Sequence, residues 1–259
     1  MEIQAKGATV YYEMQGNGPK KVLLLHGWGC STNLMKPVAD GLSGTATVLS
    51  IDFPGFGASS RPPEPWGVPE YAACVHELLE KLHFLPCSTI AHSFGARVAI
   101  YLASSGKCPF EKLVLTGAAG IRKPATPESE KRSQEFKKLK EKASMLRKTK
   151  VFASLADSIE QKAREKYGSR DYNALDEEMR KTFVKVINLD LSDRLPAVPV
   201  PTLLLWGTND TETPLWMGQK MEQSIPDAGL VELPGGTHFA YLEQIGTFNK
   251  VSKVFIMGE

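Results

Sequence analysis

The hydrophobic positions of the chain predict strands and helices in alternation. Short, uninterrupted apolar runs are typical of strands that are buried on both faces. Such runs lie at residues 47–51, 89–91, 112–115 and 202–206, and helix-length segments separate them. This alternation predicts an α/β fold with a mostly parallel sheet and right-handed crossovers.

The first 25 residues follow a different pattern. Three β-rich runs, at residues 3–5, 8–14 and 21–25, are separated by Lys6-Gly7 and by the turn sequence of residues 16–19. Short runs of this kind, punctuated by glycine, asparagine and proline, are typical of antiparallel strands joined by tight turns. An antiparallel N-terminal hairpin is therefore predicted at the start of the sheet.

Residues 121–190 interrupt the strand rhythm. Apolar side chains recur there at helical spacing with charged residues between them, which predicts an all-helical insertion. The core would then consist of residues 1–120 and 191–259. The apolar positions of the insertion are Phe136, Leu139, Ala143, Leu146, Leu175, Met179, Phe183 and Val186.

Composition and charge fit an ordinary globular protein. The 259 residues are 42% hydrophobic and 23% charged, which is sufficient for a sizeable buried core. A net charge of +2 is too small to imply a nucleic-acid partner. Residues 121–150 nevertheless hold 11 basic and 4 acidic side chains. We interpret the basic stretch 131–150 as a solvated helix face, with an anion or partner site as the alternative.

The remaining composition signals exclude other classes of protein. The four cysteines, Cys30, Cys74, Cys87 and Cys108, have neither zinc-ligand nor redox spacing. The N-terminus lacks the pattern of a secretory signal, and no run approaches the roughly 20 apolar residues of a membrane span. We therefore expect a reduced, cytoplasmic protein with no metal site and no membrane span.

One serine stands where a buried strand meets a helix. The segment Ala91-His92-Ser93-Phe94-Gly95 lies between the run at 89–91 and a helix predicted over 96–104. A nucleophilic serine requires a sharp turn with small residues two positions to either side. Ala91 departs from the usual glycine of the GxSxG pattern, but alanine is also small.

Three further motifs accompany this serine. His26-Gly27-Trp28-Gly29 and the loop 52–59 each follow a predicted strand. Asp210 follows the run at 202–206 and precedes a helix for which Thr213 is predicted as N-cap and Pro214 as the first helical residue. His238 lies on the loop after residues 230–233.

These motifs, in this order, resemble the α/β-hydrolase fold family over essentially the whole chain. The resemblance implies a serine hydrolase with a helical cap at residues 121–190. By that resemblance Ser93 is the nucleophile, His238 the general base and then acid, and Asp210 the group that orients the imidazole. The backbone N–H groups of Trp28 and Phe94 would form the oxyanion hole, and no cofactor is needed.

Several side chains beside these motifs are candidates for the substrate pocket. His26 and His92 are instead expected to pack or to hydrogen-bond loops. Thr237 departs from the family pattern, since many relatives have glycine before the histidine. The predicted pocket residues are Trp28, Phe94, Trp216 and Phe239, with Met145, Phe152 and Met179 from the insertion.

The favoured function is hydrolysis of carboxylic esters of small, mainly apolar substrates. Epoxide hydrolases and haloalkane dehalogenases of this fold carry aspartate at the position of Ser93, so serine argues against both. Hydrolysis of a thioester, lactone, amide or C–C bond remains open, as does a receptor-like protein with little turnover. The natural substrate and the oligomeric state do not follow from the sequence.

Overall fold

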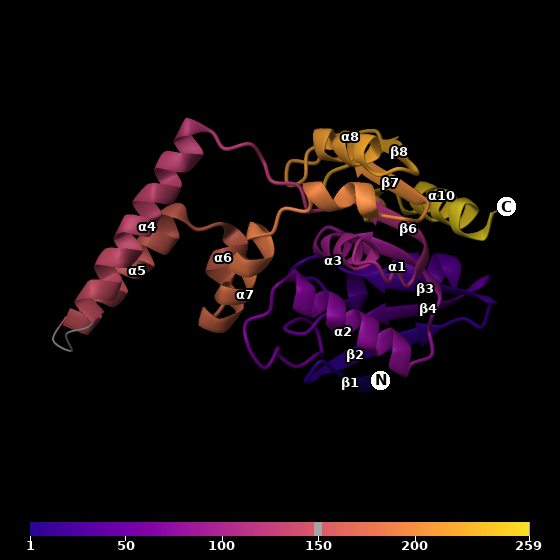
Figure 1. The fold of residues 1–259 in the computed structure, drawn as a ribbon, viewed down its shortest axis with the longest axis horizontal. Helices are drawn as coiled ribbons and strands as arrows, with labels where there is room; N and C mark the ends of the chain where they lie inside the picture. The colour runs from indigo at the N-terminus through magenta and orange to yellow at the C-terminus, as the bar shows by residue number, and fades with distance from the viewer. Residues whose placement is uncertain (148–151, 259) are drawn as a thin grey trace. The chain divides into compact units, whose positions relative to one another are not determined.

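The computed structural model describes residues 1–147 and 152–258, and its first compact unit, Met1–Ile121 with Val184–Glu259, contains one eight-stranded sheet (Figure 1). The order across the sheet is β1-β2-β4-β3-β5-β6-β7-β8. The strands are β1 (Glu2–Ala5), β2 (Ala8–Gln15), β3 (Lys20–Leu25), β4 (Ala46–Ile51), β5 (Cys87–His92), β6 (Phe110–Thr116), β7 (Thr202–Gly207) and β8 (Ala228–Leu233).

The strand directions confirm the predicted fold class. β1 pairs with β2, and β2 with β4, in antiparallel register, whereas the pairs from β4 across to β8 are all parallel. Each central strand extends past its apolar run. β5, for example, continues from the predicted residues 89–91 to include Cys87, Ser88 and His92, which are all buried. In β5, buried polar residues thus extend the strand beyond its apolar run.

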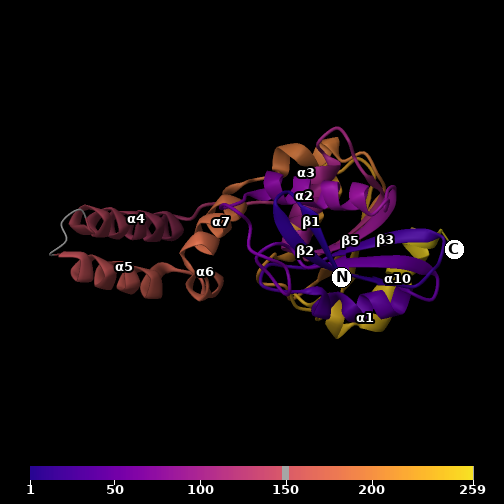
Figure 2. The same ribbon diagram turned by 90° about the horizontal axis from the view of Figure 1, so that it is seen from below.

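Helices cover both faces of the sheet. In Figure 2, α2 (Val68–Lys81) and α3 (Phe94–Ala103) lie on one face, and α1 (Thr32–Leu42) and α10 (Ile245–Met257) lie on the other. Each helix turns an apolar stripe toward the strands, as an amphipathic helix of an α/β protein does. The stripe of α1 consists of Met35, Val38, Ala39 and Leu42. This unit also contains the 3₁₀ helix η2 (Ser192–Ala197), α8 (Leu215–Ser224) and α9 (Ala240–Glu243).

The second compact unit, Arg122–Phe183, is helical. It contains α4 (Pro127–Arg147), α5 (Ala153–Tyr167), α6 (Arg170–Ala174) and the first part of α7 (Glu177–Asn188). α4 and α5 run antiparallel side by side (Figures 1 and 2), and ion pairs join Arg147 to Asp157 at 2.6 Å and to Glu160 at 2.9 Å. Their buried residues are Ala143, Ala156 and Ala163, whose small side chains allow the two helices to approach closely.

The end of α7 belongs to the first unit, so the helical unit is shorter than the predicted range 121–190. A contact that sequence patterns do not reveal joins the end of α7 to α3. The buried side chain of Arg97 on α3 donates hydrogen bonds to the backbone carbonyls of Val186 at 2.8 Å and of Leu189 at 2.5 Å. Cationic donors satisfy the carbonyl groups that a helix leaves unpaired at its C-terminus.

Candidate active site

Ser93 occupies a strained turn between β5 and α3. β5 ends at His92, α3 begins at Phe94, and Ser93 has φ 51° and ψ −106°. Positive φ is uncommon for residues other than glycine and persists only where the surroundings enforce it. Here the Ser93 N–H donates to the Thr116 carbonyl at 3.1 Å, and the Ser93 carbonyl accepts from the N–H groups of Arg97 and Ala119. This is the geometry of a nucleophile elbow.

Gly95 lets this turn press against the end of β3. A Cβ atom on Gly95 would lie 2.5 Å from the backbone oxygen of Leu25, a distance that real Cβ contacts do not reach. The Gly95 N–H donates to the His26 carbonyl at 3.1 Å. The rings of Trp28 and Phe94 meet edge to face, with centroids 5.2 Å apart. The loop after β3 and the first turn of α3, which carry the two predicted oxyanion donors, are therefore neighbours.

The structure brings Ser93, His238 and Asp210 together. Each follows a different strand of the sheet, β5, β8 and β7, and the carboxyl ends of parallel strands meet at one edge. His238 Nε2 lies 3.0 Å from Ser93 Oγ, and His238 Nδ1 lies 2.9 Å from Asp210 Oδ2. These distances form a continuous hydrogen-bonded chain from the serine hydroxyl to the carboxylate.

The Asp210 carboxylate is ionised inside the protein because four donors surround it. Oδ1 accepts the backbone N–H groups of Glu212 and Thr213, each at 2.9 Å, while Oδ2 accepts from His238 and from the Thr213 hydroxyl. Burial opposes ionisation, but these hydrogen bonds outweigh it and hold the pKa of Asp210 below its usual value. An ionised carboxylate only accepts, so the imidazole proton is on Nδ1 and the Nε2 lone pair faces Ser93.

The prediction that Thr213 caps a helix is wrong. α8 begins at Leu215, Pro214 is its N-cap, and no side chain caps it. The Thr213 hydroxyl instead donates to Asp210 Oδ2 at 2.9 Å and lies 3.3 Å from His238 Nδ1. The loop from Asp210 to Thr213 curls around the carboxylate to supply its N–H donors, and this carries the hydroxyl away from the helix.

His26 and His92 hydrogen-bond the loops of the site, in agreement with the interpretation from sequence. Burial lowers the pKa of His26 to about 4 and that of His92 to about 3, so both rings are neutral at ordinary pH. His26 Nε2 accepts the Phe53 N–H at 2.9 Å, which ties the loop after β3 to the loop after β4. His92 Nε2 lies 3.0 Å from the His238 carbonyl oxygen, and a neutral ring donates there.

Gly117 is a residue of the site that sequence reasoning missed. It follows β6 with φ +50°, and a Cβ atom there would lie 3.1 Å from His238 Nδ1 and 3.3 Å from Asp210 Oδ2. The absence of a side chain thus leaves room for the imidazole to reach the carboxylate. The signal in the sequence was a glycine directly after a buried strand run.

The predicted pocket residues divide into two groups. In the first unit, Phe94 is buried, and Trp28 packs edge to face on Phe56 with centroids 4.8 Å apart. Trp216 and Phe239 are 36% and 38% exposed, and the Phe239 ring lies 5.6 Å from that of His238. In the second unit, Met179 is buried, whereas Met145 and Phe152 are exposed. The role of all these side chains in substrate binding stays a prediction.

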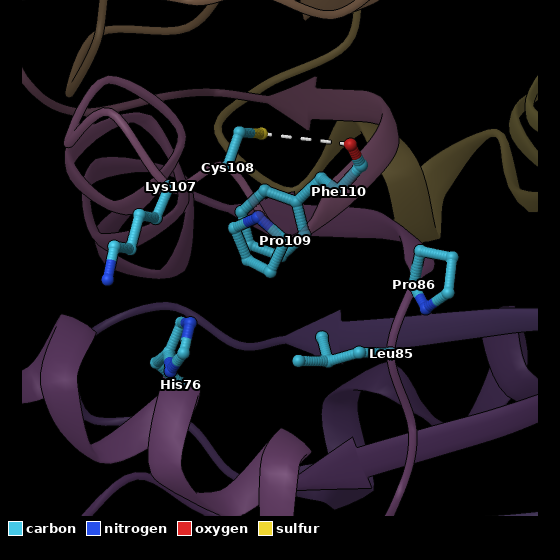
Figure 3. A pocket seen from close by; sticks show the side chains of 7 residues that line it. All are labelled: His76, Leu85, Pro86, Lys107, Cys108, Pro109 and Phe110. Carbon is cyan, nitrogen blue, oxygen red and sulfur yellow. Dashed lines mark hydrogen bonds between the residues drawn. The ribbon is translucent and has the colours of Figure 1, made fainter.

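A pocket of about 400 Å³ lies elsewhere, at the amino ends of β5 and β6 (Figure 3). Leu85 and Pro86 precede β5, and Lys107 to Pro109 precede β6, so this pocket is at the opposite end of these strands from Ser93. Its one thiol, Cys108, lies 3.7 Å from the Phe110 carbonyl oxygen, and burial raises its pKa above the ordinary value. A protonated thiol is a poor nucleophile, so this pocket does not compete with Ser93 as a reactive centre.

Within residues 1–147 and 152–258, no three histidine, cysteine or carboxylate side chains are grouped as metal ligands. Among the helices of that same part of the chain, none has both the length and the apolar character needed to cross a membrane. All four cysteines are free thiols.

Known proteins with similar sequences include one named as an esterase and one named as a hydrolase. A pimeloyl-[acyl-carrier protein] methyl ester esterase of Chromobacterium violaceum is 25% identical over 242 residues, covering 90% of this chain and 92% of that protein. A 2-hydroxy-6-oxononadienedioate/2-hydroxy-6-oxononatrienedioate hydrolase of Pseudomonas sp. is 24% identical over 259 residues, covering 96% and 92%.

Solved structures show the same fold. The enol-lactonase of Burkholderia xenovorans LB400 superposes with a TM-score of 0.75 at 20% identity, over 100% of both chains. An esterase of Exiguobacterium antarcticum has a TM-score of 0.75 at 20% identity, over 99% of this chain and 98% of its own. The model of the Alpha/beta hydrolase family matches residues 22–250. This match, together with the sheet order and the turn at Ser93, shows that the chain belongs to the alpha/beta hydrolase family.

Proposed function

We propose that the protein is a serine hydrolase that cleaves carboxylic esters of small, mainly apolar substrates through an acyl-enzyme on Ser93. The observation that carries this proposal is the hydrogen-bonded chain from Ser93 Oγ through the His238 ring to Asp210, with separations of 3.0 Å and 2.9 Å. A serine hydroxyl is a weak nucleophile until an adjacent base takes its proton. In this proposal His238 Nε2, which lies 3.0 Å from Ser93 Oγ, is that base.

In the acylation step, the Ser93 proton passes to His238 Nε2 while Oγ forms a bond to the carbonyl carbon of the ester. The carbonyl oxygen becomes an oxyanion, which two backbone N–H groups, those of Trp28 and Phe94, would stabilise. When this intermediate collapses, the bond to the alkoxy oxygen breaks and His238 returns its proton to the departing alcohol. Asp210 accepts from Nδ1 throughout and stabilises the imidazolium that forms.

Deacylation repeats these steps with water. His238 Nε2 takes a proton from a water molecule as its oxygen bonds to the acyl carbon. The bond to Ser93 Oγ then breaks, and the proton returns to the serine, so the carboxylic acid leaves and the enzyme is regenerated. This reaction requires no metal or organic cofactor.

The side chains beside the proposed oxyanion donors favour a neutral, apolar acyl group. Trp28 packs with Phe56 and Phe94 in a cluster of aromatic rings. The motifs that carry Ser93, Asp210 and His238 contain no arginine or lysine that could pair with a substrate carboxylate in bidentate fashion. Each acyl CH₂ buried against such a surface contributes at most about 0.8 kcal/mol.

Cleavage of a carbon–carbon bond is the second candidate. The supporting observation is the relative from Pseudomonas sp., whose alignment covers 96% of this chain. It is named as a hydrolase of 2-hydroxy-6-oxononadienedioate and 2-hydroxy-6-oxononatrienedioate. Hydrolysis of a thioester, lactone or amide would use the same three side chains, and a receptor-like protein with little turnover would retain them. The experiment below distinguishes these alternatives from ester hydrolysis.

We also propose that the helical segment 121–190 acts as a cap and that the protein works in the cytoplasm. The segment leaves the core after β6 and returns close to the same point, where the Leu191 N–H donates to the Gly120 carbonyl at 2.8 Å. The end of β6 neighbours the elbow, since Thr116 accepts from the Ser93 N–H. Met145, Phe152 and Met179 would then contribute to substrate selection.

The test is turnover of p-nitrophenyl esters of increasing acyl length, with matched thioesters, a lactone, an amide and a dienoate, by the wild type and by Ser93→Ala. The wild type is expected to turn over neutral esters steadily and to react with a fluorophosphonate. Ser93→Ala should fold normally and do neither. Ester turnover by Ser93→Ala close to that of the wild type would remove Ser93 from its role, and a single slow turnover by the wild type would favour a receptor.

A further inference from the structure

We propose that Thr213 is a positioning residue of the active site, whose hydroxyl fixes the Asp210 carboxylate and the His238 ring in their working orientation. This inference rests on the proposed function. It arises from the finding that the Thr213 side chain, which precedes α8 in the sequence, faces the carboxylate and not the helix.

Three polar atoms form a compact triangle at this point. Asp210 Oδ2 lies 2.9 Å from Thr213 Oγ1 and 2.9 Å from His238 Nδ1, and the latter two atoms are 3.3 Å apart. The hydroxyl proton points to Oδ2, because an ionised carboxylate is an acceptor only. The oxygen of the hydroxyl then presents a lone pair toward the Nδ1 proton, which can be shared between Asp210 and Thr213.

The backbone of Thr213 is held on both sides of the side chain. Its N–H donates to Asp210 Oδ1 at 2.9 Å, and its carbonyl accepts from Trp206 Nε1 at 2.7 Å. Trp206 is fully buried in β7, and Thr213 itself is only 7% exposed. A β-branched side chain has few χ1 rotamers, so this fixed backbone also restricts where the hydroxyl can point. The donor to Oδ2 is therefore set in place before any substrate binds.

The hydroxyl controls which direction the Oδ2 lone pairs face. The two backbone N–H groups fix Oδ1, but they leave the carboxylate free to turn about the bond to its Cβ atom by a small angle. The bond from Thr213 to Oδ2 removes that freedom, and the imidazole follows because it bonds to the same oxygen. A misplaced general base reduces the rate of proton transfer, whereas the Asp210 side chain is only 1% exposed, so a substrate does not reach it.

The experiment compares Thr213→Val, which keeps the shape but removes the hydroxyl, with Thr213→Ser, which keeps the hydroxyl. Thr89→Val is the matched control, since Thr89 is fully buried in β5 and lies outside the hydrogen-bonded chain. For each protein, kcat and KM on a neutral p-nitrophenyl ester, the rate of labelling by a fluorophosphonate and the melting temperature are measured.

Loss of one hydrogen bond to a charged group corresponds to about a tenfold to hundredfold effect. Thr213→Val is expected to lose that factor in kcat and in labelling rate with KM within about twofold, while Thr213→Ser stays within about threefold of the wild type. A Thr213→Val enzyme with unchanged kcat, or a Thr213→Ser enzyme as impaired as Thr213→Val, would overturn the inference. Ser93→Ala is measured in the same assay. If the wild type turns over the ester and Ser93→Ala does not, the proposed function stands, and a negative result for the Thr213 variants rejects only the role of Thr213.

Discussion

At the scale of single residues, the site depends on keeping a charged carboxylate stable inside the protein. The pKa of Asp210 is lowered although burial alone would raise it, because each carboxylate oxygen receives two hydrogen bonds. That charge in turn selects the tautomer of His238, with its proton on Nδ1. In the proposed mechanism, the reactivity of Ser93 thus depends on donors that never touch the serine.

Replacement of Asp210 by asparagine tests this dependence. The amide keeps the shape but can present a donor to Nδ1, which favours the tautomer with its proton on Nε2 and removes the base from Ser93. We expect kcat to fall by roughly 10⁴, the loss caused by the same substitution in a serine protease, with the fold retained. The measurement is steady-state ester hydrolysis together with circular dichroism.

Asp40→Asn is the control for this substitution. Asp40 is an exposed residue of α1 that pairs with Lys36 at 2.9 Å, and its loss should leave kcat unchanged. An Asp210→Asn enzyme with more than a tenth of the wild-type kcat would contradict the assigned role.

The sequence was sufficient to expect Ser93, Asp210 and His238 at one site, because each occupies a motif after a strand and the motifs follow in a distinctive order. Their catalytic roles stay a prediction. The sequence was not sufficient for Thr213. A threonine and a proline before a helix have the same local pattern whether the hydroxyl caps the helix or turns back to a carboxylate three residues earlier. Only the path of the loop around Asp210 decides between these two possibilities.

At the scale of elements, the elbow depends on how closely α3 approaches β3. A methyl group on Gly95 would meet the backbone oxygens of Leu25 at 2.5 Å and of His26 at 2.8 Å, and backbone atoms cannot move aside as a flexible side chain can. We therefore predict that Gly95→Ala lowers the free energy of unfolding by about 1–3 kcal/mol, as overpacked positions do, and displaces the elbow so that ester turnover falls. Urea unfolding and steady-state kinetics measure the two effects.

Gly246→Ala provides the contrast within the same molecule. Gly246 lies in α10 with no atom within 4 Å of a built Cβ. Alanine there should be neutral or stabilising by up to about 1 kcal/mol, because it restricts the unfolded chain. Equal effects of the two substitutions would show that close approach at Gly95 is not what the fold requires.

The elements themselves were predictable to different degrees. Apolar runs located the central strands, since strands buried on both faces leave a strong pattern. The ends were less predictable, as α3 begins at Phe94 and not at residue 96. In α4, Ala143 is the one predicted apolar position that is buried, whereas Phe136, Leu139 and Leu146 are half-buried. The hydrophobic periodicity therefore suggested more buried side chains on this helix than the structure has.

At the scale of the whole molecule, a contact between residues far apart in the chain joins the end of α7 to the first unit. Arg97, one turn after Ser93, binds carbonyls at the end of α7. Hydrophobic periodicity indicates that a segment is helical. It does not show which backbone carbonyls of that segment a distant arginine will bind. The compact helical unit Arg122–Phe183 therefore ends before residue 190, the limit expected from the pattern.

The buried imidazoles also make the stability of the whole protein depend on pH. The pKa values of His26 and His92 fall from an ordinary value of 6.5 to about 4 and about 3, because burial disfavours the charged form. The unfolded chain therefore binds more protons than the folded chain below about pH 6.5. Stability is complete above that pH and is lost as the pH falls toward 4 and 3.

Because the folded protein holds each imidazole neutral, each ring lowers the free energy of unfolding by about 2 kcal/mol at pH 5 relative to pH 8. The two rings together lower it by about 4 kcal/mol. This is a large part of the 5–15 kcal/mol that typically stabilises a folded protein. Urea unfolding at pH 8 and pH 5 measures the difference, and it avoids the range below about 4.5 where carboxylates titrate. His92→Gln, which cannot take up a proton, should remove about half of the difference. A free energy of unfolding that differs by less than about 1 kcal/mol between the two pH values would mean that neither imidazole is held neutral by its burial.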